Sequence, residues 1–93
     1  MPNPITEKYC FRLYVAGASL NTRLAIANIR RYCDENFQGG YELEIIDIFE
    51  HPELAETENI LAAPTLVRSQ PLPKRRIVGD LSDSGKVVAV LSR

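Results

Sequence analysis

The chain has 93 residues, of which 45% are apolar and 25% charged, and its formal net charge is −1. These values fit one soluble domain with a small core, and they offer no global electrostatic basis for binding nucleic acid or an anionic membrane. No apolar run approaches the roughly 20 residues that span a bilayer, and the first nine residues do not resemble a secretory signal. We therefore expect a cytoplasmic protein, and an oligomer because so small a core leaves little stability.

The two cysteines, Cys10 and Cys33, lie far apart in the sequence. Because neither has a cysteine neighbour, they form neither a Cys-x-x-Cys redox pair nor a metal cluster. The plain interpretation is that both are small buried hydrophobic residues. We expect no metal and no cofactor.

The first half of the chain predicts a strand, a helix and a second strand. Residues 9–15 (YCFRLYV) alternate between the two faces of a strand. Residues 22–36 then form a helix that Asn21 caps and Gly39-Gly40 ends. Its buried stripe follows three-to-four spacing and consists of Ile26, Ile29, Cys33 and Phe37, with Ala25 and Tyr32 at its border.

Residues 41–48 (YELEIIDI) predict the second strand. Ile45 and Ile46 make both of its faces apolar, which suits a strand in the middle of a sheet that is covered on both sides. Because a helix joins the two strands, we expect them to pair in parallel.

The second half is more ambiguous. Pro52 suits the first turn of a helix, and residues 65–69 and 75–79 can form a hairpin. In the last segment, Asp80 or Ser82 can cap a helix. KVVAVL is nevertheless rich in β-branched residues, and Gly85 weakens a helix by about 1 kcal/mol, so local propensity and helical pattern conflict. If that helix forms, its apolar positions are Val87, Val90 and Leu91.

The resulting order, β-α-β-α-β-β-α, is that of the α/β thioredoxin-like fold. In such folds a cis proline precedes a central strand, and Pro64 lies at that place. Their redox site follows the first strand, but residues 16–22 (AGASLNT) contain no cysteine. We expect no oxidoreductase activity and no other enzyme activity, since the one histidine, His51, has no set of partners for catalysis.

Lys74, Arg75 and Arg76, with Arg68 nearby, form the one dense cationic cluster of the sequence. The plain interpretation is a solvated hairpin, and the alternative is a docking surface for an acidic protein patch or a phosphate. No aromatic residue is interleaved with these cations, which disfavours nucleic acid as a partner.

Four stretches resemble the KaiB family of circadian clock proteins: RLYVAG, FQGGYELEIIDI, HPELAETENILAAPTLV and PLPKRRIVGDLS. The resemblance extends from about Tyr9 to Val90, and the sensor domain of the kinase SasA is a related alternative. It implies a non-enzymatic regulator that binds a KaiC-like ATPase, in a circadian clock or in stress adaptation.

The resemblance also implies two packings of one domain. KaiB-like proteins rest as homodimers or homotetramers with the order β-α-β-β-α-α-β, and they rearrange to a thioredoxin-like monomer. The single domain, 1–93, then has a flexible N-terminus (1–8), a β-α-β half (9–50) and a switchable half (51–93). We expect Gly79→Ala and Asp80→Arg to favour the thioredoxin-like form. By this resemblance, the residues that control the switch are Gly79, Asp80, Pro64, Pro71 and Pro73.

Some positions depart from the family pattern. KaiA docks on the second strand of family members at a small residue and a lysine, which here are Glu42 and Glu44. A charge reversal at an interface is costly, so KaiA is disfavoured as a partner. Asn59 replaces a lysine before Ile60, and the arginine of the first helix is one position early, at Arg23. The candidate partner-binding residues are therefore Arg23, Glu42, Glu44, Asn59, Lys74, Arg75 and Arg76.

Overall fold

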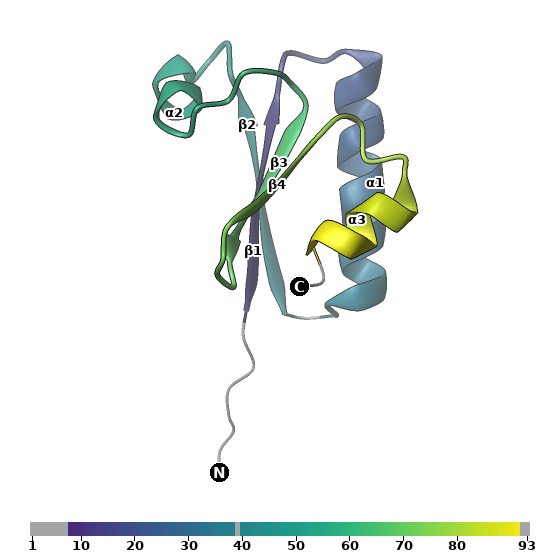
Figure 1. The fold of residues 1–93 in the computed structure, drawn as a ribbon. Coiled ribbons are helices and arrows are strands. Elements are labelled where there is room, and N and C mark those ends of the chain that lie inside the picture. The colour runs from purple at the N-terminus through teal and green to yellow at the C-terminus, as the bar shows by residue number, and fades with distance from the viewer. Residues whose placement is uncertain (1–7, 39, 92–93) are drawn as a thin grey trace.

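The computed structural model describes residues 8–38 and 40–91 (Figure 1). The elements follow the thioredoxin-like order predicted from the sequence, and not the alternative order β-α-β-β-α-α-β. Most of the predicted flexible N-terminus and Gly39 of the predicted helix stop lie outside the described residues. The elements are β1 (Tyr9–Val15), α1 (Leu20–Asn36), β2 (Tyr41–Asp47), α2 (Pro52–Thr57), β3 (Thr65–Gln70), β4 (Arg75–Val78) and α3 (Ser84–Leu91).

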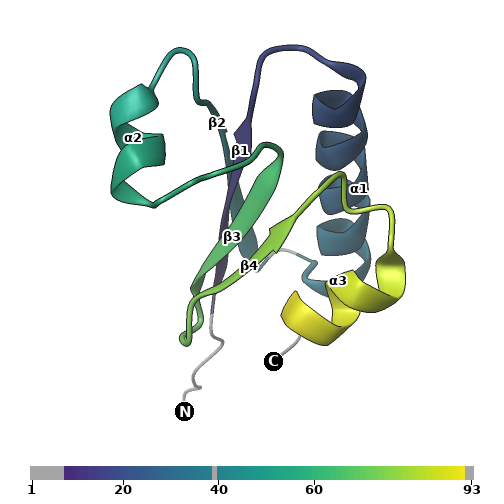
Figure 2. The same ribbon diagram turned by 45° about the horizontal axis from the view of Figure 1, so that its top comes forward.

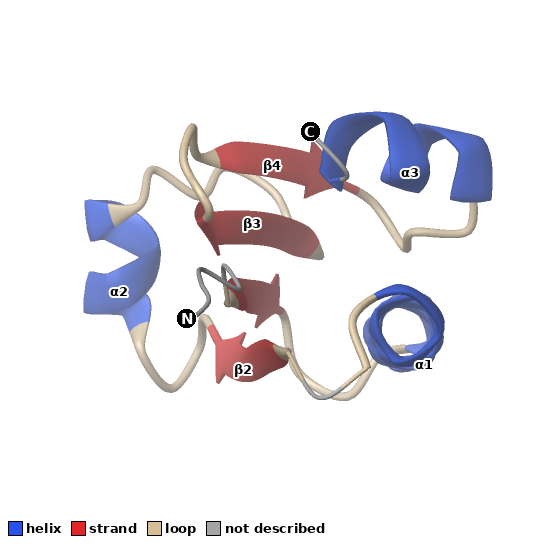
Figure 3. Cartoon of the chain, turned by 90° about the horizontal axis from the view of Figure 1, so that it is seen from below, coloured by secondary structure: helices blue, strands red, loops and turns tan. Residues whose placement is uncertain are grey.

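The four strands form one sheet in the order β2-β1-β3-β4. β1 pairs in parallel with β2, as predicted, and antiparallel with β3, while β3 and β4 form the predicted hairpin. α1 and α3 lie on one face of the sheet and α2 on the other (Figures 2 and 3).

The prediction that the second strand lies in the middle of the sheet is wrong, because β2 is an edge strand. Ile46 is buried, whereas Ile45 is 37% exposed on the opposite face. Only the face of β2 that carries Ile46 is well covered there, by apolar residues of the α2 region such as Leu54 and Ile60.

Apolar clusters fill both sides of the sheet. Because side chains of β1 alternate between its two faces, this strand contributes residues to both clusters. Leu13 belongs to the larger cluster, which includes residues of α1 and α3. Tyr14 belongs to the smaller cluster with Ile46 and Val67, on the side of α2. The predicted period-two pattern of this strand is therefore confirmed.

α1 begins at Leu20, because Ser19 and not Asn21 is its N-cap: the Ser19 hydroxyl accepts a hydrogen bond from the Thr22 N–H at 3.2 Å. The buried stripe is also rotated from the predicted one, since Ile26 and Phe37 are only half-buried. The buried residues of α1 are Thr22, Ala25, Ile29, Tyr32 and Cys33.

The C-terminal segment is helical despite its β-branched residues. Asp83 caps α3, in place of the predicted Asp80 or Ser82: its carboxylate accepts from the Lys86 N–H at 3.1 Å. Val87 and Leu91 are buried, and Val90 is half-buried. Burial of this apolar stripe against the rest of the domain therefore overrides the local preference for a strand.

Candidate partner-binding surface

An open apolar groove of about 410 Å³ lies along the segment that contains α2. At its margin Phe49 is 73% exposed and Leu61 is 96% exposed. Large apolar side chains that gather in the open are typical of a protein-binding surface. The apolar part of the lining consists of Ile48, Phe49, Pro52, Ala55, Ile60 and Leu61.

Asp47 holds the turn that presents Phe49. Its carboxylate accepts a hydrogen bond from the Phe49 N–H at 2.9 Å and a longer one from the Gly17 N–H at 3.4 Å. Gly17 has a φ of 65°, and a side chain there would contact the Phe49 ring. The loops after β1 and β2 are thereby joined, and the aromatic ring lies over their junction.

Sequence reasoning missed this groove. Phe49 follows a strand in a polar context, and Leu61 counts among the apolar positions of a weak helical pattern that starts at Pro52, whereas α2 ends at Thr57 and leaves Leu61 exposed. A large apolar residue that fits neither neighbouring element is the signal that could have identified Phe49.

A charged cluster joins α2 to β4 through Glu58. The Glu58 carboxylate accepts from Lys74 at 3.1 Å and from Arg76 at 2.7 Å, and its side chain is only 16% exposed. Arg76 also donates to the backbone carbonyl of Asn59 at 3.3 Å. Three predicted partner-binding residues therefore lie together, but the two cations already have a carboxylate partner within the chain.

Arg75 is exposed on β4, whereas the prediction that Arg68 belongs to the same solvated cluster is wrong. Arg68 is fully buried. On β3 it shares a face with Leu66, which belongs to the cluster between the sheet and the helices α1 and α3. The guanidinium therefore lies inside the domain and is no part of a docking surface.

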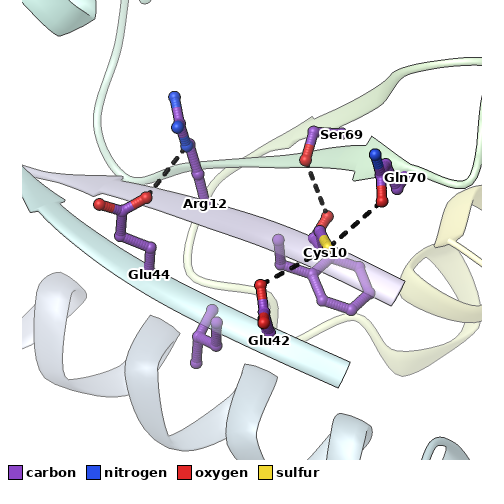
Figure 4. Close-up of a pocket in the computed structure, with 8 residues that line it drawn as sticks. Cys10, Arg12, Glu42, Glu44, Ser69 and Gln70 are labelled. Carbon is purple, nitrogen blue, oxygen red and sulfur yellow. Dashed lines mark hydrogen bonds and ion pairs between the residues drawn. The ribbon is translucent and has the colours of Figure 1, made fainter. Parts of the chain in front are cut away.

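A second hollow, of about 670 Å³, lies on the sheet face that carries α2, beyond that helix (Figure 4). Arg12 Nε lies 3.1 Å from Glu44, and Lys8 Nζ lies 2.8 Å from Glu42. The hydrogen bond from Lys8 lowers the pKa of the Glu42 carboxyl. Both glutamates are therefore paired within the chain, and not free charges on the edge strand.

The predicted partner-binding residues do not form one site. Glu42 and Glu44 lie on β2, at one edge of the sheet, and Lys74 and Arg76 belong to the segment of β4, at the opposite edge. Arg23 is exposed on α1, which covers the other face. The open groove beside α2 is consequently the stronger candidate for a partner.

The three prolines assigned to switch control all follow cis peptide bonds. Pro64 immediately precedes β3, as the thioredoxin-like pattern predicts, and Pro71 and Pro73 lie in the turn between β3 and β4. The carbonyl of Pro64 accepts a hydrogen bond from the Gly79 N–H at 2.9 Å.

Gly79 and Asp80 lie in the loop that leads into α3. Gly79 has a φ of 120°, a conformation that side-chain-bearing residues rarely adopt. The Asp80 carboxylate accepts hydrogen bonds from Ser82, which lowers its pKa. The Asp80 carbonyl accepts from the Asn28 side chain at 2.9 Å. This loop therefore fixes the start of α3 to α1.

Both cysteines are free thiols. Cys33 is buried, as predicted, and burial raises the pKa of its thiol to about 12. Cys10 departs from the prediction because it is only half-buried, with its sulfur 3.6 Å from Gln70 and 3.9 Å from Glu42. The two thiols occupy different elements, and neither follows β1 where thioredoxin-like redox sites lie.

Residues 8–38 and 40–91 include neither a cluster of metal ligands nor a membrane-spanning helix. Within them, no group of three or more His, Cys, Asp or Glu side chains could hold a metal ion. No helix in this part of the chain has the length and apolar character needed to cross a membrane.

Solved structures share the fold at low sequence identity. The N-terminal domain of Synechococcus elongatus SasA matches with a TM-score of 0.76 and 17% identity, over 95% of this chain and 87% of that one. Mitochondrial thioredoxin 3 from Saccharomyces cerevisiae matches with a TM-score of 0.68 and 15% identity, over 88% of this chain and 77% of that one. These likenesses show that the fold is thioredoxin-like.

Sequence comparisons are more specific. The KaiB domain model matches residues 12–93. The circadian clock oscillator protein KaiB of Trichodesmium erythraeum is 43% identical over 92% of this chain and 83% of its own length. KaiB of Synechococcus elongatus is 48% identical over 88% of this chain and 80% of its own length. With one domain model and close relatives spanning nearly its whole length, the chain belongs to the KaiB family.

Proposed function

We propose that this protein is a non-enzymatic regulator that acts by binding a KaiC-like ATPase, in a circadian clock or in stress adaptation. Relatives that are 43% and 48% identical are named circadian clock oscillator proteins. The observation that carries a binding role is the open apolar groove beside α2, with Phe49 and Leu61 at its margin.

Burial of the groove supplies the binding energy. Covering a side chain the size of Phe49 or Leu61 contributes about 1.5–3 kcal/mol. Three exposed carboxylates, Glu50, Glu53 and Glu56, lie on the same segment. A partner surface with an apolar centre and basic flanks therefore complements this region best.

The test is size-exclusion chromatography with a purified KaiC homologue, in each phosphorylation state and after incubation for up to a day. The double variant Phe49→Ala/Leu61→Ala should weaken the complex at least about tenfold. Leu72→Ala is the matched control, because Leu72 is also an apolar residue in the open, at 77% exposure. It lies in the hairpin turn at the other end of the molecule (Figure 1). A wild-type chain that forms no complex under any of these conditions would rule out the partner.

KaiA stays disfavoured as a partner. Lys8 and Arg12 already pair with Glu42 and Glu44, so a docking strand would meet two carboxylates held by intrachain ion pairs. A homodimer or homotetramer and a cytoplasmic location stay predictions. Analytical ultracentrifugation tests the first and cell fractionation the second.

Control of a second packing by Gly79, Asp80, Pro64, Pro71 and Pro73 also stays a prediction, but the expected direction is reversed for both Gly79→Ala and Asp80→Arg. Its φ of 120° strains an alanine, so Gly79→Ala should disfavour the present packing. Asp80→Arg removes the acceptor for Ser82 and should act in the same direction. NMR spectra of both variants test this, and a gain in the present packing would contradict it.

A redox-inactive, SasA-like sensor or adaptor domain is the second candidate function. It is favoured by the similarity of the backbone to the SasA N-terminal domain. Under this alternative the partner is a histidine kinase encoded beside or fused to the chain. Binding to that kinase, with none to the KaiC homologue, would replace the first proposal.

A further inference from the structure

Arg68 is the largest fully buried side chain of the described residues. It lies on β3, between β1 and β4, on the face that α1 and α3 cover. A guanidinium stays charged at any pH that the fold survives, so this position places a permanent cation inside the domain. Such a burial is costly unless specific partners receive the charge.

The partners of Arg68 are backbone carbonyls. Nη1 donates to the carbonyl of Leu91 at 2.7 Å, and Nη2 donates to the carbonyl of Pro73 at 2.8 Å. Across residues 8–38 and 40–91, none of the ion pairs involves Arg68. One side chain thus joins the central strand, the hairpin turn and the C-terminal end of α3.

The Leu91 carbonyl belongs to the last turn of α3, where backbone carbonyls lack partners within the helix and the helix dipole is negative. α3 has no basic residue of its own in that turn. Arg68, from another element, supplies the missing cation. A helix of eight residues with three valines does not persist alone in water, so α3 depends on contacts of this kind.

Two features oppose the docked position of α3. Arg68 Nε is buried and has no hydrogen-bond partner, so part of the guanidinium loses its hydration without compensation. Leu81, in the loop that leads into α3, has a φ of 66° while its side chain is buried. A left-handed leucine is strained, and the strain persists only while its surroundings hold it.

We propose that Arg68 is the anchor that decides whether α3 is docked on the sheet, and that this docking is reversible. When α3 leaves, the guanidinium regains water and Leu81 relaxes, so the helix separates at a lower free energy than the core unfolds. When α3 returns, the hydrogen bonds to Leu91 and Pro73 fix its C-terminal end. This device is independent of the identity of the binding partner.

Native-state amide hydrogen exchange of the full chain tests the proposal. In the wild type, the amides of Val87 to Leu91 should exchange through an opening that leaves β1 and α1 protected. Arg68→Gln should raise the exchange of these α3 amides by about 10- to 100-fold, because it removes hydrogen bonds from a charged donor. Amides of β1 and α1 should change much less.

Arg68→Lys keeps the charge but offers one ammonium to two carbonyls, so the rise in α3 exchange should be intermediate. This variant decides the question if Arg68→Gln fails to fold. Arg30→Gln, the same change at an exposed arginine of α1, should leave α3 exchange unchanged. The proposal is overturned if wild-type α3 exchanges only with global unfolding, or if loss of Arg68 speeds α1 exchange as much as α3 exchange.

Discussion

α1 and α3 lie on the same face of the sheet but are held there in different ways. α1 has 17 residues, a serine cap within its own sequence and five buried residues. α3 has eight residues and two buried ones, and a strand residue, Arg68, contacts its last turn. A helix can therefore be stabilised mainly by its own sequence, as α1 is, or mainly by contacts with the surface on which it packs, as α3 is.

The largest difference should appear when one buried residue is removed from each helix. Ile29 and Leu91 are both fully buried. Ile29→Ala should lower the free energy of unfolding by about 2–5 kcal/mol, because α1 belongs to the core that unfolds cooperatively. Leu91→Ala should lower it less, because α3 can separate first. Urea denaturation followed by circular dichroism measures both, and an equal loss would remove the distinction between the helices.

A smaller loss of stability is expected at the contact between α2, which is also short, and the segment of β4, where Glu58 pairs with two cations. Glu58→Gln should cost about 1 kcal/mol of unfolding free energy, because it weakens a shared carboxylate that receives both Lys74 and Arg76. Glu56→Gln, on the exposed side of α2, is the matched control and should be nearly neutral. Thermal denaturation compares the two. Equal melting temperatures would show that the ion pairs do not hold α2 in place.

The two N-caps allow a similar comparison. Ser19→Ala should lower the global free energy of unfolding by about 1 kcal/mol, since the Thr22 N–H loses its acceptor. Asp83→Ala removes the acceptor for the Lys86 N–H, but it should mainly speed amide exchange within α3. If Asp83→Ala lowers global stability as much as Ser19→Ala does, then α3 unfolds together with α1.

The smallest effect concerns pH. Hydrogen bonds from Ser82 lower the pKa of Asp80 below its ordinary value of 3.8. The contribution of the carboxylate is therefore complete above that value and is lost as pH falls through the lower pKa of the folded state. The Ser82 amide should exchange faster at pH 2 than expected from its behaviour at pH 5. Asp80→Asn should abolish this pH dependence, and persistence of the dependence would point to another group.

Much of the fold follows from local patterns. The alternation of residues 9–15 predicts the first strand, and the helix that follows predicts a parallel pair with the second strand. The segment 70–74 (QPLPK) between two strand-like segments predicts the hairpin. Predictions were wrong at positions whose structure depends on contacts with other elements or on the exact boundary of an element. Ile45-Ile46 suggested a central strand, but the order of strands placed β2 at an edge. Asn21 and Ser19 are both residue types that favour the N-cap position, and local sequence does not distinguish them. In the structure α1 begins at Leu20, so Ser19 is the cap.

The binding surface was less predictable than the fold. Glu42, Glu44, Lys74 and Arg76 are charged residues that looked available for a partner, yet each pairs within the chain. Ion pairs form between residues far apart in sequence, so composition and spacing do not reveal them. The exposure of Leu61 depends on the path of the backbone between α2 and β3, which local sequence patterns do not predict.

Residue types at given positions were enough to predict a thioredoxin-like order of elements without a Cys-x-x-Cys pair, and to indicate the KaiB family. The conformation of the C-terminal segment and the burial of individual side chains depend on the folded chain. In the folded chain the C-terminal segment is a helix, Arg68 is buried beneath it, and Phe49 and Leu61 are exposed. The physical reason is that burial and charge pairing are properties of surfaces brought together from distant parts of the chain.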